Sequence, residues 1–269
     1  MLQFCLLGSG SSGNALLVLS EQTKILIDNG LSYKQLEARA RLVGQGLEDL
    51  SAVFVTHEHG DHVKGLGVLC RKRPIPVFMT EQTRENLPRS LGPLPHVAAY
   101  EAGETIVWQD MELGSFSVSH DAIDPVSYVV RSQGAQLGLA TDLGHLSNLV
   151  RTRLSGSHAL IVEANYCPDR LRVGPYPPQI QQRIRSRLGH LSNQDMCSLL
   201  SDLQHELLQL VVLVHISENN NHPELVTRMA RQALRNDGVG LHVAAQDAPT
   251  PMMRVCEAPT HTATAYEPG

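Results

Sequence analysis

Thr56-His57-Glu58-His59-Gly60-Asp61-His62 is the stretch that decides the predicted fold of this chain. It places three imidazoles and the Asp61 carboxylate within six residues, directly after the apolar run of residues 50–55, which has the pattern of a buried strand. Histidine and aspartate side chains are ligands of divalent ions such as Zn²⁺ and Mn²⁺. The His-x-His spacing suits an extended loop and differs from the His-Glu-x-x-His of a zinc-binding helix. The stretch therefore predicts a metal-binding loop at a strand end, in preference to a polar surface loop.

Length and composition favour a single large domain. The chain has 269 residues, 42% of them hydrophobic, and no shift in composition marks a linker. We predict one domain over residues 1–250 and a flexible tail over residues 251–269. The formal net charge of −5 excludes a global basic field, so a surface for nucleic acid must be local.

The cysteines and the apolar runs indicate the cellular compartment. Five cysteines stand far apart and include no Cys-x-x-Cys pair, which argues against a disulfide framework and for a reducing environment. The first residues contain no basic segment of the kind that begins a signal peptide. The longest apolar run, residues 207–214, is too short to cross a bilayer. These features predict a soluble, cytoplasmic protein.

A glycine-rich segment near the start of the chain resembles a dinucleotide-binding motif. Gly8-Ser9-Gly10-Ser11-Ser12-Gly13 fits Gly-x-Gly-x-x-Gly, and Asp28 follows at a compatible distance. That motif requires a helix after its third glycine, but residues 15–19 and 24–28 have the pattern of two strands. The glycines are therefore predicted to form a tight turn between strands.

Several of the apolar strands predicted along the chain end in a residue that can bind a metal or transfer a proton. Strands at a common edge of a layered α/β fold would bring these side chains together. A first metal site still lacks a third imidazole after the His57 and His59 pair, and His120 is placed to supply it. The residues at these strand ends are Asp28, His57, His120, Asp142, Glu163 and His215.

The motif His-x-His-x-Asp-His, together with the glycine-rich start, resembles the metallo-β-lactamase fold superfamily over nearly the whole chain. The resemblance implies a four-layer αββα sandwich that binds two divalent ions, Zn²⁺ or Mn²⁺. It places Asp142 between the two ions and gives Asp28 the role of orienting the histidine loop. One ion is expected on His57, His59 and His120, and the second on Asp61, His62 and His215. Paired ions of this kind support hydrolysis.

Two further segments resemble the phosphodiesterase branch of that superfamily. Glu163 and His190 match the pair that carries a proton to the leaving oxygen in this branch, so we expect them, with Asp61, to be catalytic. Residues 119–122, 189–193 and 215–220 are most similar to the YycJ/WalJ group, whose members are regarded as 5′-to-3′ DNA exonucleases linked to repair. Gly60 and Leu143 differ from the residues that are common at these positions, and neither change removes a ligand.

An arginine-rich segment is the candidate surface for DNA. Residues 170–187 contain five arginines and no carboxylate, and residues 178–188 have helical spacing. We predict that Arg183, Arg185 and Arg187 contact phosphates, because guanidinium groups bind phosphate in a bidentate manner. The alternative is a solvated helix face. DNA, as single strands or duplex ends, is the predicted partner.

Three other functions remain open at this point. A phosphodiesterase for cyclic or other small substrates, or an RNA-processing nuclease, would use the same metals and the same proton pair. A thioester or lactam hydrolase would need neither Glu163 nor His190. A non-catalytic binding module would not need the complete set of ligands.

Overall fold

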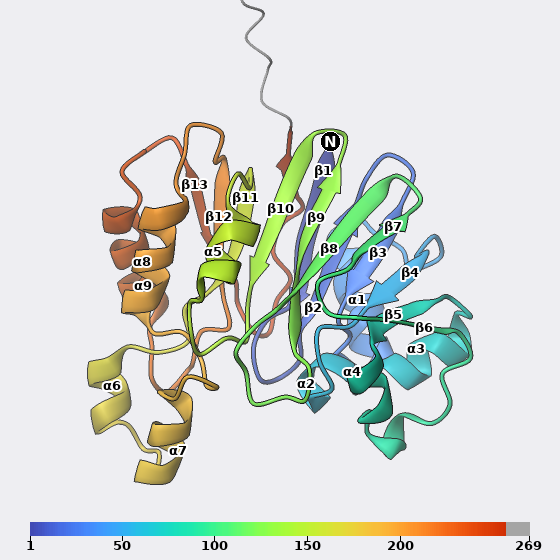
Figure 1. Cartoon of the computed structure of the whole chain (residues 1–269), viewed down its shortest axis with the longest axis horizontal. Coiled ribbons are helices and arrows are strands. Elements are labelled where there is room, and N and C mark those ends of the chain that lie inside the picture. The colour runs from blue at the N-terminus through green and yellow to red at the C-terminus, as the bar shows by residue number, and fades with distance from the viewer. Residues whose placement is uncertain (257–269) are drawn as a thin grey trace, which may run out of the picture.

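Two seven-stranded sheets lie face to face in the computed structural model of the chain, which describes residues 1–256 (Figure 1). The first sheet has the order β14-β1-β2-β3-β4-β5-β6 and the second β13-β12-β11-β10-β9-β8-β7. The strands of the first sheet are β1 Leu2–Gly8, β2 Ala15–Leu19, β3 Lys24–Ile27, β4 Ala52–Phe54, β5 Val77–Thr80, β6 Val97–Tyr100 and β14 Met253–Val255. Those of the second are β7 Thr105–Trp108, β8 Met111–Ser117, β9 Val126–Ser132, β10 Ala135–Ala140, β11 Ala159–Glu163, β12 Leu210–Val214 and β13 Gly240–Val243.

Helices cover the outer face of each sheet, which completes the predicted αββα order (Figure 1). Leu36 of α1 and Leu69 of α3 pack on the first sheet. Val150 of α5 and Leu199 of α8 are among the residues that pack on the second. The helices are α1 Tyr33–Leu42, α2 Gly60–Val63, α3 Leu66–Lys72, α4 Glu81–Glu85, the 3₁₀ turn η1 Arg89–Leu91, α5 Asn148–Leu154, α6 Pro168–Val173, α7 Pro178–Ile184, α8 Asn193–Leu203 and α9 Pro223–Ala233.

Side-chain alternation explains why the central strands are apolar throughout. In β3, Ile25 and Ile27 point into the core between the sheets, whereas Leu26 faces the helices. In β12, Val212 and Val214 face the inter-sheet core and Leu213 faces α8 and α9. Successive strand residues point to opposite faces, so a strand covered on both sides must be apolar at every position.

The predicted strand ends converge because the strands that precede them run in one direction. Strands β10, β11 and β12 are parallel to one another, and β8 runs in the same direction because it is antiparallel to β9, which is antiparallel to β10. Strands β3 and β4 are likewise parallel. Their carboxyl ends meet at the edge of the sandwich that carries α2, α6 and α7, at the bottom of Figure 1.

Two predicted boundaries differ from the structure. The domain does not end at residue 250, because Met253–Val255 forms β14 and pairs with β1. Residues 257–269 of the predicted tail lie outside the described part of the chain. The helix expected over residues 178–188 ends at Ile184, because the chain turns back there and His190 N–H donates to the Ile184 carbonyl.

Within residues 1–256, no helix combines the length and the apolarity needed to cross a bilayer.

Candidate active site

The histidine loop is fixed by backbone hydrogen bonds to two neighbouring turns. Asn14 N–H donates to the carbonyl of Asp61 at 2.7 Å, and Asn29 N–H donates to that of His62 at 2.7 Å. Gly30 lies so close that a Cβ atom there would stand 1.6 Å from the Asp61 carbonyl oxygen. Only glycine fits at this contact. The glycine-rich turn between β1 and β2 therefore supports the loop, as the sequence predicted in place of a dinucleotide site.

Three histidines form the first group of potential metal ligands. The ligand atoms of His57, His59 and His120 lie within 4.8 Å of one another. Nε2 of His57 is 3.1 Å from Nδ1 of His59. Nδ1 of His120 lies 3.2 Å from the Gly189 carbonyl, which leaves its Nε2 for the group. This arrangement is the one predicted for the first ion.

A second group of potential metal ligands lies on the other sheet, and it contains Glu163 and His190, which the sequence did not predict as ligands. Asp142, Glu163, His190 and His215 place ligand atoms within 4.8 Å of one another. His62 connects the two groups, since its Nε2 is 3.4 Å from Oδ2 of Asp142. The same Nε2 atom is 3.6 Å from Oδ2 of Asp61. Of the set predicted for the second ion, His62 and His215 therefore lie next to Asp142, and Asp61 lies next to His62. Glu163 and His190 complete the group around Asp142.

Three of the residues at this edge have an unusual backbone conformation. Asp28, Asp142 and His215 have φ angles of 61°, 53° and 55°, in the left-handed region that L-residues seldom adopt. Asp28 and His215 directly follow the last residue of β3 and β12, and Asp142 comes two residues after the end of β10. In each case the turn directs the side chain to the site. Such conformations concentrate at functional sites, where the surrounding structure holds them in place.

The residues present fit a divalent cation. Oδ2 of Asp142 and Nδ1 of His215 are buried and have no hydrogen-bond partner in the described structure. Nδ1 of His215 lies 3.0 Å from Oδ1 of Asp142, but the two groups are not aligned for a hydrogen bond. Leaving buried polar atoms without partners is costly, and a bound cation would satisfy both.

The electrostatics of the two groups also suit a cation. Burial lowers the pKa of His57 well below its usual value and also lowers the pKa of His120. Both imidazoles are therefore neutral near pH 7, as metal ligands must be. Burial would raise the pKa of Asp142, but His215 and His62 outweigh it and hold that pKa well below the usual range. Burial would lower the pKa of His62 and His215, but their carboxylate neighbours raise these values to about 9 and about 10. Both imidazoles therefore hold a proton near pH 7, and a bound cation would displace it.

Asp28 orients the loop from beneath it. Its Oδ1 accepts the N–H of Thr56 at 2.8 Å, and its Oδ2 accepts the Thr56 hydroxyl at 2.8 Å. Nδ1 of His62 lies 2.8 Å from the same Oδ2 atom, so Nε2 of His62 is turned towards Asp142. A carboxylate bound to the far nitrogen of a histidine fixes the direction of the ring.

Glu163 and His190 form a pair next to the metal-ligand groups. Oε1 of Glu163 lies 2.7 Å from Nδ1 of His190, and Oε2 accepts the backbone N–H groups of Leu143 and Leu191. The glutamate is fully buried, whereas the side chain of His190 is 23% exposed. The carboxylate thus fixes the imidazole and leaves its Nε2 atom towards the open side of the site.

Comparison with known proteins identifies the family. Residues 23–216 match the family described as "Beta-lactamase superfamily domain". The chain belongs to the metallo-β-lactamase superfamily. Among its relatives, "Exodeoxyribonuclease YycJ" of Bacillus anthracis is 37% identical over 89% of this chain and 92% of its own length. "Exodeoxyribonuclease WalJ" of Streptococcus pneumoniae strain D39 is 33% identical over 94% of this chain and 98% of its own.

The fold of the superfamily is also found in solved structures. The metallo-β-lactamase fold protein YhfI from Bacillus subtilis superimposes with a TM-score of 0.71 over 93% of this chain and 99% of its own, at 14% identity. Together with the two ligand groups, the exodeoxyribonuclease relatives make this chain a metal-dependent hydrolase.

The arginines of the predicted DNA surface have different surroundings. Arg183, at the end of α7, donates from its guanidinium to Asp121 at 2.6 and 2.5 Å. Burial would raise the pKa of Asp121, but this contact lowers it. Arg185 and Arg187 are exposed in the turn after α7 and have no ion-pair partner within residues 1–256. The three residues therefore do not share one helix face.

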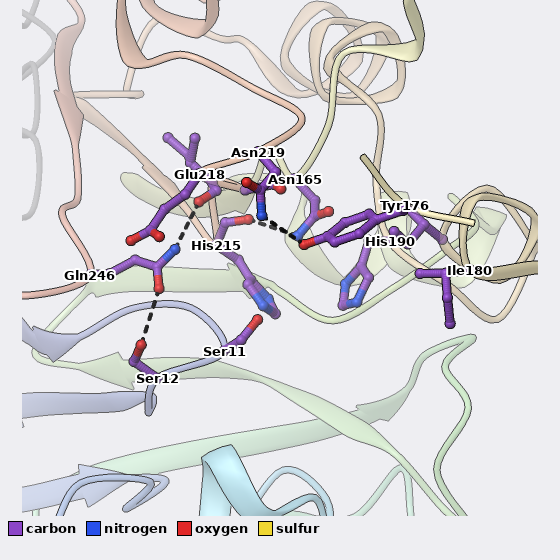
Figure 2. A pocket seen from close by; sticks show the side chains of 13 residues that line it. Ser11, Ser12, Asn165, Tyr176, Ile180, His190, His215, Glu218, Asn219 and Gln246 are labelled. Carbon is purple, nitrogen blue, oxygen red and sulfur yellow. Dashed lines mark hydrogen bonds between the residues drawn. The ribbon is translucent and has the colours of Figure 1, made fainter. Parts of the chain in front are cut away.

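Sequence reasoning missed several residues that complete this metallo-β-lactamase-type site. Asn14 donates from Nδ2 to Oδ2 of Asp61 at 3.1 Å, and the Ser9 hydroxyl accepts the N–H of His215 at 2.9 Å. Asn165 donates to the His215 carbonyl at 2.9 Å (Figure 2). Ser9 lies in the glycine-rich motif and Asn14 directly follows it, so that motif was the signal that could have indicated them.

Proposed function

We propose that this chain is an exodeoxyribonuclease that removes nucleotides from a DNA end with two divalent ions, Zn²⁺ or Mn²⁺, in its site. The observation that carries the proposal is the Glu163–His190 pair beside Asp142, in a chain whose relatives are named exodeoxyribonucleases over most of its length. By the resemblance to the YycJ/WalJ group, we extend the proposal to 5′-to-3′ polarity, a role in DNA repair and a cytoplasmic location.

The proposed metal ligands are distributed over the two groups. His57, His59 and His120 would hold one ion, Asp61, His62 and His215 the other, and Asp142 would contact both. When bound, divalent ions supply Lewis acidity, which activates a water molecule and stabilises negative charge on the phosphate. Asp28 would keep the His62 ring in the orientation that this requires.

His190 is the proposed general acid. In its imidazolium form it keeps Nδ1–H on Glu163 and presents Nε2–H towards the reacting phosphate. The attacking water gives one proton to solvent, and its oxygen forms the new bond to phosphorus while the bond from phosphorus to the leaving oxygen breaks. The leaving oxygen takes the Nε2 proton, and His190 regains a proton from solvent before the next cycle. A nucleotide alkoxide is a poor leaving group near neutral pH and needs that proton, whereas a nitrophenolate leaves without it.

The test compares two substrates in the same variants. We expect His190→Ala to slow hydrolysis of end-labelled DNA by roughly 10²–10⁴-fold, because a general acid contributes about that much. The loss on bis(p-nitrophenyl) phosphate should be far smaller, and both metal ions should remain. Glu163→Gln should act in the same direction but more mildly, because the glutamate positions and charges the imidazole. Rates are measured under single-turnover conditions, with metal analysis of each variant.

His96→Ala is the matched control, because this exposed histidine lies outside both ligand groups. Equal losses on the two substrates, with loss of one ion, would mean that His190 is a metal ligand and not the acid. Wild-type protein is also tested on RNA, nitrocefin and a thioester. Faster turnover of any of these than of DNA would replace the proposed function with that of the corresponding hydrolase.

A further inference from the structure

A pocket of about 380 Å³ opens beside the second ligand group (Figure 2). His190 and His215 form part of its wall, so a molecule in the pocket touches the reacting region directly. The rest of the wall comes from the turn between β1 and β2, the loop after β11, the segment around α7, and the loops after β12 and β13. The mechanism described above leaves this volume unassigned.

The pocket has an apolar side and a polar side. Tyr176, Ile180 and Ile184 provide the apolar side, and the side chain of Ile180 is 40% exposed. The polar side carries neutral hydroxyl and amide groups, from Ser11, Ser12, Asn165, Ser217, Asn219 and Gln246. No lysine or arginine of residues 1–256 lines the pocket, and Glu218 adds a carboxylate. Away from His190 and His215, a phosphate group is therefore a poor occupant, since no lysine or arginine there would offset its charge.

Tyr176 is held in place although it contributes nothing to the core. Its hydroxyl accepts a hydrogen bond from Nδ2 of Asn219 at 3.1 Å, and its carbonyl accepts one from Nε2 of Gln181 at 2.9 Å. Helix α7, which follows, has no buried residue. Figure 2 shows the ring between Asn219 and Ile180, on the wall that also carries His190. Core packing does not explain an aromatic ring fixed in this position.

We propose that this pocket binds the base of the nucleotide at the DNA end, with the base stacked on Tyr176. The proposal rests on the proposed function for its DNA substrate. A nucleobase has apolar faces and a hydrogen-bonding edge, which match the two sides of the pocket. The phosphate being cleaved would lie at the ligand groups, and the base of the same nucleotide is one sugar away. His190 and Tyr176 line the same pocket, so a base beside that phosphate can reach the ring.

Two properties follow from this geometry. Stacking accepts every base, and hydroxyl and amide groups can both donate and accept hydrogen bonds, so the pocket should tolerate all four bases. A paired base has its edge occupied by its partner and cannot enter. The end nucleotide must therefore be unpaired, at a single strand or a frayed duplex end, and a mismatched end should be degraded faster than a matched one.

The experiment measures discrimination between a normal and an abasic end nucleotide in otherwise identical single-stranded DNA. In the wild type, loss of the base should raise KM by roughly 5- to 150-fold, the range expected for one base stacked on an aromatic side chain. Tyr176→Ala should abolish this ratio, whereas Tyr176→Phe, which keeps the ring, should retain most of it. Tyr33→Ala, at a partly buried tyrosine on α1, is the matched control and should keep the full ratio.

A binding measurement separates this proposal from the proposed function. Calorimetry compares dAMP with deoxyribose 5-phosphate on the metal-loaded wild type and the Tyr176→Ala variant. Equal affinity for both compounds would overturn the base pocket even if DNA is hydrolysed. An unchanged ratio of KM values in Tyr176→Ala would do the same. If the wild type fails to hydrolyse DNA but binds dAMP more tightly in a Tyr176-dependent manner, the exonuclease assignment fails and the base pocket stands.

Discussion

At the scale of single residues, the site depends on carboxylates that position histidines. Glu163 fixes His190 through Nδ1, and Asp28 does the same for His62. Each carboxylate is buried and also accepts backbone N–H groups, so its own position is fixed. The orientation of the proton donor His190 and of the metal ligand His62 is therefore set by the carboxylate that binds the other side of each imidazole ring.

Asp28→Asn is a direct test of this positioning. Asparagine tolerates the left-handed backbone at this position, so the change removes the charge and one acceptor without new backbone strain. We expect metal affinity to fall by roughly 10–100-fold, because His62 loses the partner that orients it. Competition with a chromogenic chelator measures the affinity. Unchanged affinity in a folded variant would show that the Thr56 and His62 contacts of Asp28 serve folding alone.

At the scale of elements, the segment from α6 to the turn after α7 is set apart from the core. It projects at the edge of the sandwich that carries the site (Figure 1), and α7 buries none of its residues. Leu171 of α6 is buried, but α7 is held by polar contacts such as the ion pair of Arg183 with Asp121. A segment with so little apolar burial is suited to contact a substrate, and its exposed arginines can contribute charge.

Removal of three charges from this segment tests its proposed role in DNA binding. We expect Arg183→Gln, Arg185→Gln and Arg187→Gln together to weaken DNA binding and to reduce its salt dependence, by a slope of up to about one per lost phosphate contact. Arg185 and Arg187 should account for most of the effect, because Arg183 is already paired with Asp121. Fluorescence anisotropy at several salt concentrations measures both quantities.

The triple variant should keep its hydrolysis of bis(p-nitrophenyl) phosphate nearly intact. Arg235→Gln removes one charge at an exposed position after α9, is the control for the single substitutions, and should bind DNA as the wild type does. A salt slope equal to that of the wild type in the triple variant would mean that the arginines form only a solvated face.

At the scale of the whole molecule, the metal groups join the two sheets. His57, His59 and His62 follow β4 of the first sheet, whereas His120, Asp142 and His215 follow β8, β10 and β12 of the second. A divalent ion held by both sets would bind only the folded sandwich. Ligands that bind the native state alone raise its stability by mass action.

Metal removal should therefore lower the melting temperature. At a free metal concentration of about 1,000 times Kd, linkage contributes about 4 kcal/mol. This corresponds to a fall in melting temperature of roughly 8–16 °C on chelation for a protein of this size.

The Asp142→Ala variant should lose both ions or bind them with altered ligands, and its melting temperature should no longer change on chelation. Asp202→Ala, on the outer helix α8, should behave as the wild type. Calorimetry with and without chelator, and metal analysis, test this expectation. Fewer than two ions per wild-type chain under metal-replete conditions would contradict the binuclear site.

The sequence by itself determined the apolar strands and the polar residues at their ends, and its resemblance to a known superfamily implied the sandwich. The strand features are local: the continuous apolar runs of β3 and β12 and the glycine turn that excludes a dinucleotide site each depend on neighbours in the chain. They are readable because a strand or a turn is specified by a few adjacent side chains.

Only the tertiary structure decided the rest. The pairing of β14 with β1, the contact of Arg183 with Asp121 and the pocket around Tyr176 each join residues far apart in sequence. The position of Glu163 and His190 beside Asp142 was likewise a matter of strand register and left-handed turns. These contacts arise from the packing of strands and sheet edges that are distant in sequence. No local sequence pattern specifies which distant side chains this packing brings together.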